Sequence, residues 1–466
     1  MPDTSWTPDL SAFPGPKYLA LSRALREAIR AGQLPRGSRL PPVRDLAWSL
    51  GVTPGTVARA YQQATQEGLL AATVGRGTFV ATDEPHLGPT QPLFSDPVTD
   101  LPGRVDMRSP TLPEVGQARA FAAALDRIGA GIGPLWHDYP SQTDEAPLRR
   151  AICDWLSDRQ LGPLSAEDVV LCLGGQNAIS LILLCCLRGD RPVVLTEDLA
   201  YPGFRHAARL ARAEVVGVET DGEGMIPEAL ETACRRHGAQ VLCLTAEAQN
   251  PTTARMGPAR RDEIAAIARR YDLQVIDDDC YALASSDLPS LRALMPERCW
   301  HIGSWSKSIS PALRFGYVVC PRGLGRSGRL TAQHSFFALP RPLSELALDL
   351  LDSGEARRLR AAVHAEQDRR LARATLTLAG HDLAWQPGVQ FLFLRLAHGW
   401  QASAFARAAE TAGVLIRPAD EYATPGSRAP NAVRIAIAGR LPIEDFQAGL
   451  DRLAHLLDHP AGDAAV

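Results

Sequence analysis

The chain has 466 residues, 45% of them hydrophobic and 22% charged, with a formal net charge of −3. This length allows two to four domains with sizeable cores, and the composition excludes a fibrous or disordered protein. The longest apolar run, residues 178–187, is about half of the roughly 20 residues that a membrane span needs. Met1-Pro2-Asp3 lacks the basic and apolar regions of a signal peptide. We therefore expect a cytoplasmic protein with no membrane partner.

Cysteine and histidine placement argues against a metal site. The nine cysteines are scattered without a C-x-x-C pair, which favours reduced, buried thiols over a disulfide framework or a zinc site. His137, His206 and His301 show no metal-ligand spacing and are expected at the polar surface or in a satisfied interior. No metal is therefore predicted.

Residues 1–82 are predicted to form a small α/β domain. They carry nine Lys and Arg against five Asp and Glu, an excess that suits a polyanion, although a solvated basic face would explain it equally well. A third helix opens with Thr53 as N-cap and Pro54 at its first position, after Gly51 has closed the second. The first two helices are indicated by apolar residues at helical spacing: Leu21, Leu25, Ala28, Ile29, Val43, Leu46 and Leu50. This is a helix-turn-helix layout.

A hairpin is predicted to follow the third helix. Two short strands, residues 69–74 and 78–81, flank Gly75-Arg76-Gly77. The two glycines permit the positive φ angles of a tight turn and leave Arg76 at its tip. A hairpin in this place makes the module a winged helix-turn-helix.

Along residues 16–81 the chain resembles the GntR family of regulators, through the motifs L-P-P-V-R-D-L-A, G-V-T-P-G-T-V, E-G-L-L and G-R-G-T-F-V. The resemblance implies double-stranded DNA as a partner, with Arg44, Thr53 and Thr56 facing it and Arg76 and Gly77 approaching the minor groove. Relatives commonly carry a basic or polar pair where this chain has Pro54-Gly55, so Arg59, one turn along, is the candidate substitute. The alternative for Arg44 and Arg59 is a plain surface charge.

Residues 83–105 are predicted to be an extended linker, and residues 106–466 a second, larger domain. The linker contains five prolines and few periodic apolar positions. Beyond it, apolar strand-like runs alternate with helical stretches, which indicates an α/β fold with a largely parallel sheet. The strand-like runs are residues 168–173, 192–196, 241–245 and 274–276, and the helical stretches include 176–187 and 260–271.

The strongest chemical signal is the run from Gly303 to Ser308, with Arg314 downstream. Pyridoxal 5'-phosphate needs a lysine amine for a Schiff base, and hydroxyls and a cation for its phosphate. Lys307 supplies the amine in this run. Ser304, Ser306 and Arg314 are placed to hold the phosphate.

Three strand-like runs upstream end in groups that suit the same cofactor. Asp278 ends one run, where a carboxylate can keep a pyridine nitrogen protonated. Asn250 follows another and could offer its amide to the ring hydroxyl. Gly175 and Gln176 follow a third and open a helix, whose free backbone N–H groups accept phosphate.

Residues 135 to 440 resemble fold-type I aminotransferases, with the large part at about 135–330, and the fusion resembles the MocR subfamily of GntR-type regulators. The resemblance implies Lys307 as the Schiff-base residue, Asp278 as partner of the pyridine nitrogen, and Tyr201 stacked on the ring, these three being the catalytic groups. It further implies that Tyr281 and Asn250 bind the ring oxygen, and that Arg434 binds a substrate carboxylate. Phosphate would be held by Gly175, Gln176, Ser304, Ser306 and Arg314, and by Tyr139 from the other subunit of a homodimer.

Several positions depart from that pattern or admit a simpler interpretation. Thr253 stands where relatives have glycine, Gly175 where serine is frequent, and Asp144 where glycine is usual, so loop geometry and one phosphate hydroxyl are in question. Tyr201 and Tyr139 could be plain core or interface aromatics, and Arg434 a structural ion pair. Asp277 and Asp279 are expected to be helix-capping or solvated carboxylates.

Two hypotheses for function follow. The first is a DNA-binding transcriptional regulator that senses an amino compound or the B6 vitamer itself. The second is a working aminotransferase with an accessory DNA-binding-like module. A complete wing and recognition helix favour the first, but every group needed for transamination is present, so turnover stays open.

Overall fold

The computed structural model describes residues 6–13, 16–66, 69–73, 77–81, 103–281, 286–397 and 399–459. The chain divides into two compact units, Met1–Gln91 and Pro92–Val466, and the division falls inside the segment for which a linker is predicted. Most of that segment lies outside the described residues. Its last residue, Val105, already belongs to a strand of the second unit.

The first unit contains three helices and a hairpin: α1 (Lys17–Arg30), α2 (Val43–Leu50), α3 (Pro54–Gln66), β1 (Leu70–Thr73) and β2 (Gly77–Val80). The apolar stripes of the helices meet in one core, in which Leu21, Leu25 and Val57 are fully buried. Burial of these stripes holds the short helices, since helices of this length are marginal alone. The predicted winged helix-turn-helix is confirmed.

The turn between α2 and α3 is built as the sequence indicates. Gly51 caps α2 with φ 60° and ψ 38°, in the left-handed region that favours glycine. The Oγ1 of Thr53 accepts a hydrogen bond from the backbone N–H of Thr56 at 3.3 Å, which caps the start of α3. The hairpin pairs Leu70 with Val80 and Thr73 with Gly77, one residue earlier on its second strand than predicted.

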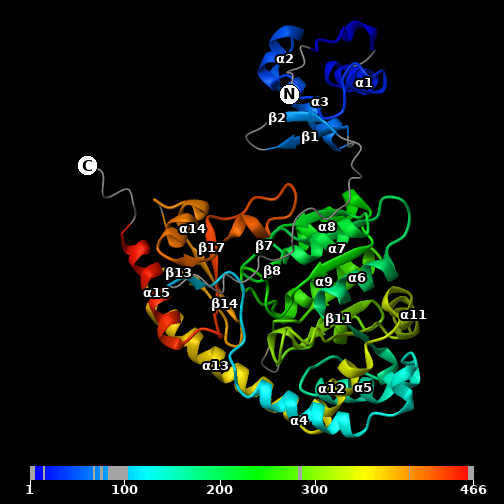
Figure 1. Ribbon diagram of the computed structural model, residues 1–466, viewed down its shortest axis with the longest axis vertical. Helices are drawn as coiled ribbons and strands as arrows, with labels where there is room; N and C mark the ends of the chain where they lie inside the picture. Colours follow the sequence, from blue (N-terminus) through cyan, green and yellow to red (C-terminus); the bar gives the residue numbers. More distant parts are fainter. Residues whose placement is uncertain are drawn as a thin grey trace. The chain divides into compact units, whose positions relative to one another are not determined.

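A seven-stranded sheet forms the middle of the second unit (Figure 1). Its order is β4 (Val169–Cys172), β12 (Gly316–Val319), β11 (Cys299–Ser304), β10 (Gln274–Asp278), β9 (Val241–Leu244), β5 (Val193–Glu197) and β6 (Glu214–Val218). β12 is antiparallel to both of its neighbours, and the other pairs are parallel. The predicted mostly parallel sheet is therefore confirmed.

Helices cover both faces of this sheet, because its strands are apolar on both sides. Apolar residues of α6 (Gly175–Cys186), α7 (Pro202–Leu210) and α11 (Gly325–Phe336) pack on one face. Those of α8 (Pro227–His237) and α9 (Pro258–Arg270) pack on the other. A further cluster joins β4 and β12 to α4 (Gln117–Ala130), α5 (Gln142–Trp155) and α12 (Arg341–Asp352).

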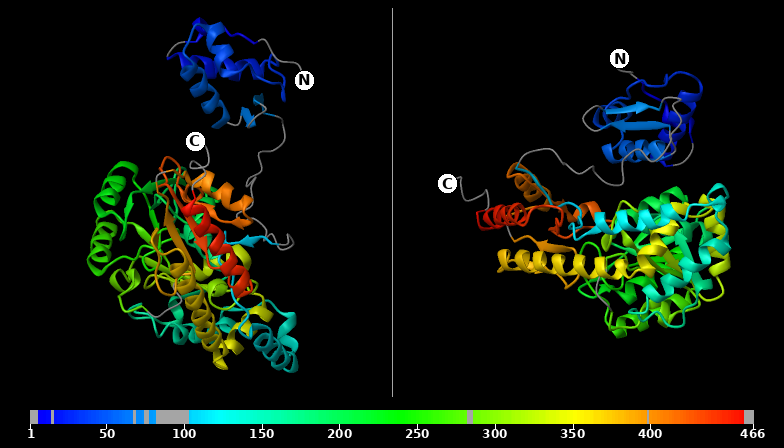
Figure 2. Two further views of the ribbon diagram at one scale, coloured as in Figure 1. Left: turned by 90° about the vertical axis from the view of Figure 1, so that its left-hand side faces the viewer. Right: turned by 60° about the horizontal axis from the view of Figure 1, so that its bottom comes forward.

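The carboxyl-terminal part of the second unit is a smaller antiparallel sheet with helices. Its order is β13 (Asp382–Ala384), β14 (Phe391–Arg395), β17 (Ala432–Ala436) and β16 (Arg417–Pro418). The long helix α13 (Glu355–Thr377) leads into it and lies beside α15 (Ile443–Asp458), as both views of Figure 2 show. β3 (Val105–Asp106) pairs in parallel with β15 (Val414–Leu415) at its edge.

No helix among the described residues has the combined length and apolarity needed to cross a membrane. In the same part of the chain, no group of three or more His, Cys, Asp or Glu side chains is arranged to hold a metal ion.

Candidate functional site

The carboxyl ends of β4, β9 and β10 bring three predicted site segments to one edge of the large sheet. Gly174 follows β4 and caps α6, Asn250 follows β9, and Asp278 is the last residue of β10. β11 runs beside β10, with Asp278 opposite Ile302, and leads directly into the short 3-10 helix Trp305–Lys307. Four segments far apart in sequence therefore meet around Lys307.

Lys307, the predicted Schiff-base residue, carries a buried amine. Burial lowers the pKa of its amine to about 8, and the positive charges of Arg434 and Arg314 act in the same direction. An ordinary lysine titrates near 10.4, so roughly 200-fold more of the Lys307 amine is neutral at pH 7. A neutral amine is the form that attacks a carbonyl carbon. Its Nζ lies 5.6 Å from the centroid of the Tyr281 ring.

Asp278 is a buried carboxylic acid. It is 7% exposed, and burial raises the pKa of its carboxyl group. The backbone N–H of Cys280 donates to its Oδ1 at 3.0 Å. Within the described residues no lysine, arginine or histidine makes an ion pair with it. A protonated pyridine nitrogen would supply the missing positive charge, so this residue fits the cofactor.

Hydroxyls, a guanidinium and a helix start form a cup for a phosphate group. Ser304 Oγ donates to Ser306 Oγ at 3.1 Å, and Arg314 Nη1 donates to the same oxygen at 3.4 Å. Gly174, with φ 81°, allows the Arg314 guanidinium to lie 2.8 Å from where a Cβ would stand. α6 begins here at Gly175, and its free N–H groups suit an anion.

Close packing explains why position 175 is a glycine. A Cβ at this position would lie 2.8 Å from the Sγ of Cys280, so serine would not fit without displacing that thiol. The hydroxyls that the structure places in this cup are those of Ser304 and Ser306.

Tyr281, Asn250 and Arg434 form one hydrogen-bonded chain. Asn250 Nδ2 donates to the Tyr281 hydroxyl at 3.3 Å, and Arg434 Nη1 donates to Asn250 Oδ1 at 2.8 Å. Arg434 Nη2 donates to the backbone carbonyl of Arg108 at 2.6 Å. The Arg434 guanidinium lies 4.9 Å from the ring centroid of Tyr422. Sequence reasoning predicts the first three residues but gives no signal for Arg108 or Tyr422.

Tyr201 caps the start of α7, and Gln176 lies in the first turn of the neighbouring helix α6. Gln176 Nε2 donates to the carbonyl of Gly203 at 3.1 Å, so its amide is engaged within the protein. A Cβ at Gly203 would overlap the Tyr201 ring, which shows how closely α7 packs on that ring. Burial and the charge of Asp278 raise the pKa of Tyr201, which stays neutral.

Tyr139 is not brought to Lys307 within one chain. Its side chain is 81% exposed and stacks on Phe337, with ring centroids 5.4 Å apart. A role at the phosphate of another subunit is left untested by this arrangement.

The expectation for Asp277 and Asp279 is wrong, because both carboxylates are buried. Alternation along β10 turns Asp278 to one face and its two neighbours to the opposite face, which is also covered. His301, opposite Asp277 on β11, lies 3.7 Å from Asp277 Oδ2 and 3.8 Å from Asp279 Oδ2. Arg159 lies 3.5 Å from Asp279. These four residues form a buried cluster of titratable side chains on the face of the sheet opposite Asp278.

Two departures from the family pattern have local explanations. Thr253 has φ 65°, so the loop keeps the left-handed conformation although it lacks glycine. Its N–H donates to the Gln249 carbonyl at 2.7 Å, which helps to hold that conformation. Asp144 forms a capping box with Ser141 at the start of α5.

The predicted DNA-facing residues differ in exposure and in the contacts that their side chains already make. Arg44 is exposed in the first turn of α2. Thr53 and Thr56 join their hydroxyls at 2.9 Å. The Arg59 guanidinium lies 3.9 Å from the ring centroid of Tyr18, so contact with DNA would require it to leave that ring. Gly77 has φ 111° at the start of β2, and Arg76 lies outside the described residues.

A winged helix-turn-helix joined to a fold-type I domain with a lysine site defines a class of two-domain regulators. Residues 17–80 match the family model described as bacterial regulatory proteins, gntR family. Residues 106–453 match aminotransferase class I and II. The chain belongs to the aminotransferase class I and II family and has the MocR architecture, in which a GntR domain precedes that fold.

One curated relative matches this chain along nearly the whole length of both proteins. The chain is 30% identical to the uncharacterized HTH-type transcriptional regulator YdeF of Bacillus subtilis, over 97% of each chain. It is 29% identical to the HTH-type pyridoxine biosynthesis transcriptional regulator PdxR of Corynebacterium glutamicum, over 65% of each. Among solved structures it resembles LysN, an alpha-aminoadipate aminotransferase of Thermus thermophilus complexed with N-(5'-phosphopyridoxyl)-L-leucine. That match has 25% identity and a TM-score of 0.66, and covers 77% of this chain and 92% of LysN. The regulator hypothesis is favoured over the enzyme hypothesis.

Proposed function

We propose that this protein is a pyridoxal-5'-phosphate-dependent transcriptional regulator that binds double-stranded DNA in the cytoplasm. Its second unit senses an amino compound or the B6 vitamer. The observation that carries the proposal is the convergence of Lys307, Asp278 and the phosphate cup in a chain that also contains a complete winged helix-turn-helix. The name of PdxR, a pyridoxine biosynthesis regulator, supports the vitamer as one signal.

Bound pyridoxal phosphate supplies an aldehyde that captures primary amines and a ring that withdraws electrons. In this chain Lys307 would offer its amine to that aldehyde, and Asp278 would hold a proton at the pyridine nitrogen. Ser304, Ser306 and Arg314 would bind the phosphate, and Tyr201 would cover the ring. Arg434 is available to a ligand carboxylate, which favours an amino acid over a plain amine.

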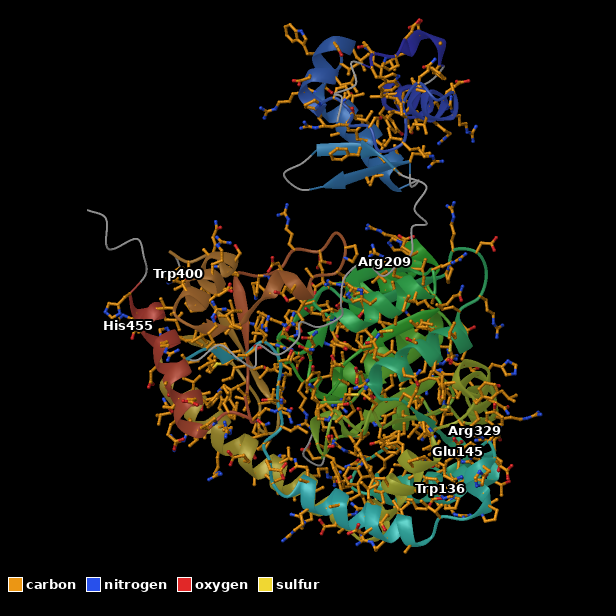
Figure 3. The ribbon with its side chains drawn as sticks, in the orientation of Figure 1. Trp136, Glu145, Arg209, Arg329, Trp400 and His455 are labelled. Carbon is orange, nitrogen blue, oxygen red and sulfur yellow. The ribbon has the colours of Figure 1, made fainter. Side chains whose placement is uncertain are left out.

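We also propose a homodimer in which the exposed aromatic pair is covered by the second copy. Apolar side chains lie exposed around Tyr139: Ile132, Leu135, Tyr139 and Phe337. Phe337 also lines a small pocket with Glu145 and Arg329, which Figure 3 labels. Exposed apolar side chains such as the stacked pair Tyr139 and Phe337 are typical of subunit interfaces.

Light scattering should give a mass of twice 50.2 kDa for the cofactor-loaded protein. Phe337→Asp should shift it towards the monomer, because a carboxylate would be buried in the interface. Leu376→Asp is the matched control: Leu376 is 79% exposed on α13 and should leave the mass unchanged. A wild-type monomer with cofactor fully bound would contradict the proposed dimer.

Arg44→Ala should weaken DNA binding by about tenfold, because one charge-assisted phosphate contact contributes about 1.4 kcal/mol. The slope of log affinity against log salt should fall by about one unit. The measurement is fluorescence anisotropy on a fragment selected in vitro with the wild-type protein. Cofactor content should stay unchanged, because Arg44 belongs to the other unit.

Arg30→Ala is the control for this measurement. Arg30 is exposed in the last turn of α1, and its substitution removes the same charge as Arg44→Ala. Equal effects of the two variants would mean that Arg44 acts through net charge alone. Unchanged binding of Arg44→Ala would show that Arg44 does not face DNA.

A further inference from the structure

The segment that leads out of the linker region lies directly on the ligand-binding arginine. Residues 103–108 are the first described residues after the DNA-binding unit. Their backbone is held by β15, where the N–H groups of Val105 and Met107 donate to Gly413 and Leu415, each at 2.8 Å. Ala436, at the end of β17, donates to the Met107 carbonyl at 2.8 Å. The strand pairing itself covers only two residues of β3.

Two guanidinium groups converge on one carbonyl of this segment. Arg434 Nη2 donates to the Arg108 oxygen at 2.6 Å, and Arg417 Nε donates to the same oxygen at 3.1 Å. The two arginines are directly opposite each other on β17 and β16. We call Arg434, Arg417 and the Arg108 carbonyl the arginine clamp. The buried residue Arg434 therefore ties the ligand site to the chain that continues towards DNA.

A ligand carboxylate and the Arg108 carbonyl compete for the same donor. Arg434 Nη1 is occupied by Asn250 at 2.8 Å, which leaves Nη2 and Nε for a carboxylate. Hydrogen bonds from a guanidinium to a carboxylate are roughly twice as strong as those between neutral groups, and two can form in parallel. An arriving carboxylate would therefore draw Nη2 from Arg108, leaving Arg417 as its remaining side-chain donor.

We propose that Arg434 is a coupling residue: a carboxylate bound to it releases the Arg108 carbonyl, loosens residues 103–108, and so changes the DNA affinity of the preceding unit. The inference rests on the proposed function. It adds a physical route by which ligand binding in the second unit changes DNA binding by the first. A ligand shifts a conformational equilibrium only if its contacts differ between the two conformations.

The test needs no identified ligand, because Arg434→Gln and Arg417→Gln each remove one donor of the arginine clamp. Both are made in the full-length, cofactor-loaded protein. Amide hydrogen exchange of residues 103–111 should become faster by about fivefold or more in both variants. DNA dissociation constants on the selected fragment should shift in the same direction in both, again by about fivefold or more.

Arg428→Gln is the matched control, an exposed arginine on the same carboxyl-terminal part, and should change both quantities less than twofold. Acetate serves as the minimal carboxylate probe, compared with chloride at equal ionic strength. It should speed exchange in the wild type and in Arg417→Gln, and have little further effect on Arg434→Gln, which lacks the guanidinium that binds the probe. Arg417 is 17% exposed, so its substitution disturbs the core less than that of the buried Arg434. Arg417→Gln therefore decides the test if Arg434→Gln does not fold.

Normal DNA binding with unchanged exchange in both variants would overturn the coupling while leaving the regulator proposal intact. An arginine that only binds ligand would give this result, since no ligand is present. Faster exchange with unaltered DNA affinity would also overturn it. Failure to select any DNA fragment would overturn the proposed function, and the inference with it.

Discussion

Lys307→Ala is expected to lose covalent pyridoxal phosphate completely, together with the visible absorbance of the bound cofactor and its response to added amines. The lysine amine is the group that forms the bond, and alanine offers no nucleophile. Folding should survive, because the substitution leaves no charge stranded in the pocket. Binding of DNA should also survive, since the helix-turn-helix is a separate unit. Borohydride reduction followed by intact mass measurement should find one cofactor per wild-type chain and none on the variant.

The other lysine of the chain provides the control for this experiment. Of its 49 lysine and arginine residues, two are lysines, Lys307 and Lys17. Lys17 is exposed at the start of α1, and Lys17→Ala should retain the full adduct. An undiminished adduct on Lys307→Ala would refute the assignment of the cofactor lysine. Rapid wild-type transamination without specific DNA binding would instead support the enzyme hypothesis.

Asp278→Asn should weaken cofactor binding by about 30-fold or more. Removing one partner of a buried charge pair costs about 2–5 kcal/mol, and the amide cannot hold a proton at the pyridine nitrogen. The amine-dependent spectral change should slow as well, because an unprotonated ring withdraws electrons less strongly. Equilibrium dialysis and stopped-flow absorbance would measure the two effects.

Asp272→Asn tests whether loss of any nearby carboxylate has this effect. Asp272 precedes β10, its side chain is 93% exposed, and the substitution should leave cofactor affinity unchanged. A cofactor affinity within threefold of wild type for Asp278→Asn would contradict the role of Asp278.

The helix-turn-helix could be predicted because each of its signals is local. The apolar spacing of Leu21 and Leu25, the left-handed Gly51 and the capping Thr53 act within a few residues of one another. Local preferences of this kind are kept in the folded chain, because burial in the core stabilises the same residues in the same conformation.

The cofactor site could be predicted for a different reason. Parallel strands present their carboxyl ends at one edge, so residues after separate strands can be grouped without any knowledge of strand order. Gly175, Asn250 and Asp278 are placed by this rule, and Lys307 is found from its own motif. Their hydrogen-bond partners within the loops, such as Tyr281 for Asn250, follow from short distances along the chain or from the resemblance.

Interactions that depend on which strands are neighbours could not be predicted. The sequence predicts Asp277 and Asp279 as helix-capping or solvated carboxylates. Their partner His301 becomes apparent only when β11 is placed beside β10. The Arg108 carbonyl likewise meets Arg434 through a backbone atom, which carries no side-chain signal. Both depend on non-local pairing of the sheets.

The scarcity of lysine has a consequence for how the protein would measure its vitamer. Guanidinium groups remain protonated and do not condense with aldehydes, so an arginine-rich surface is inert towards pyridoxal phosphate. Lys307 is the lysine whose pKa is lowered, and the exposed Lys17 is the other lysine of the chain. With one competing lysine amine, occupancy of the proposed site should follow a curve close to one-site saturation.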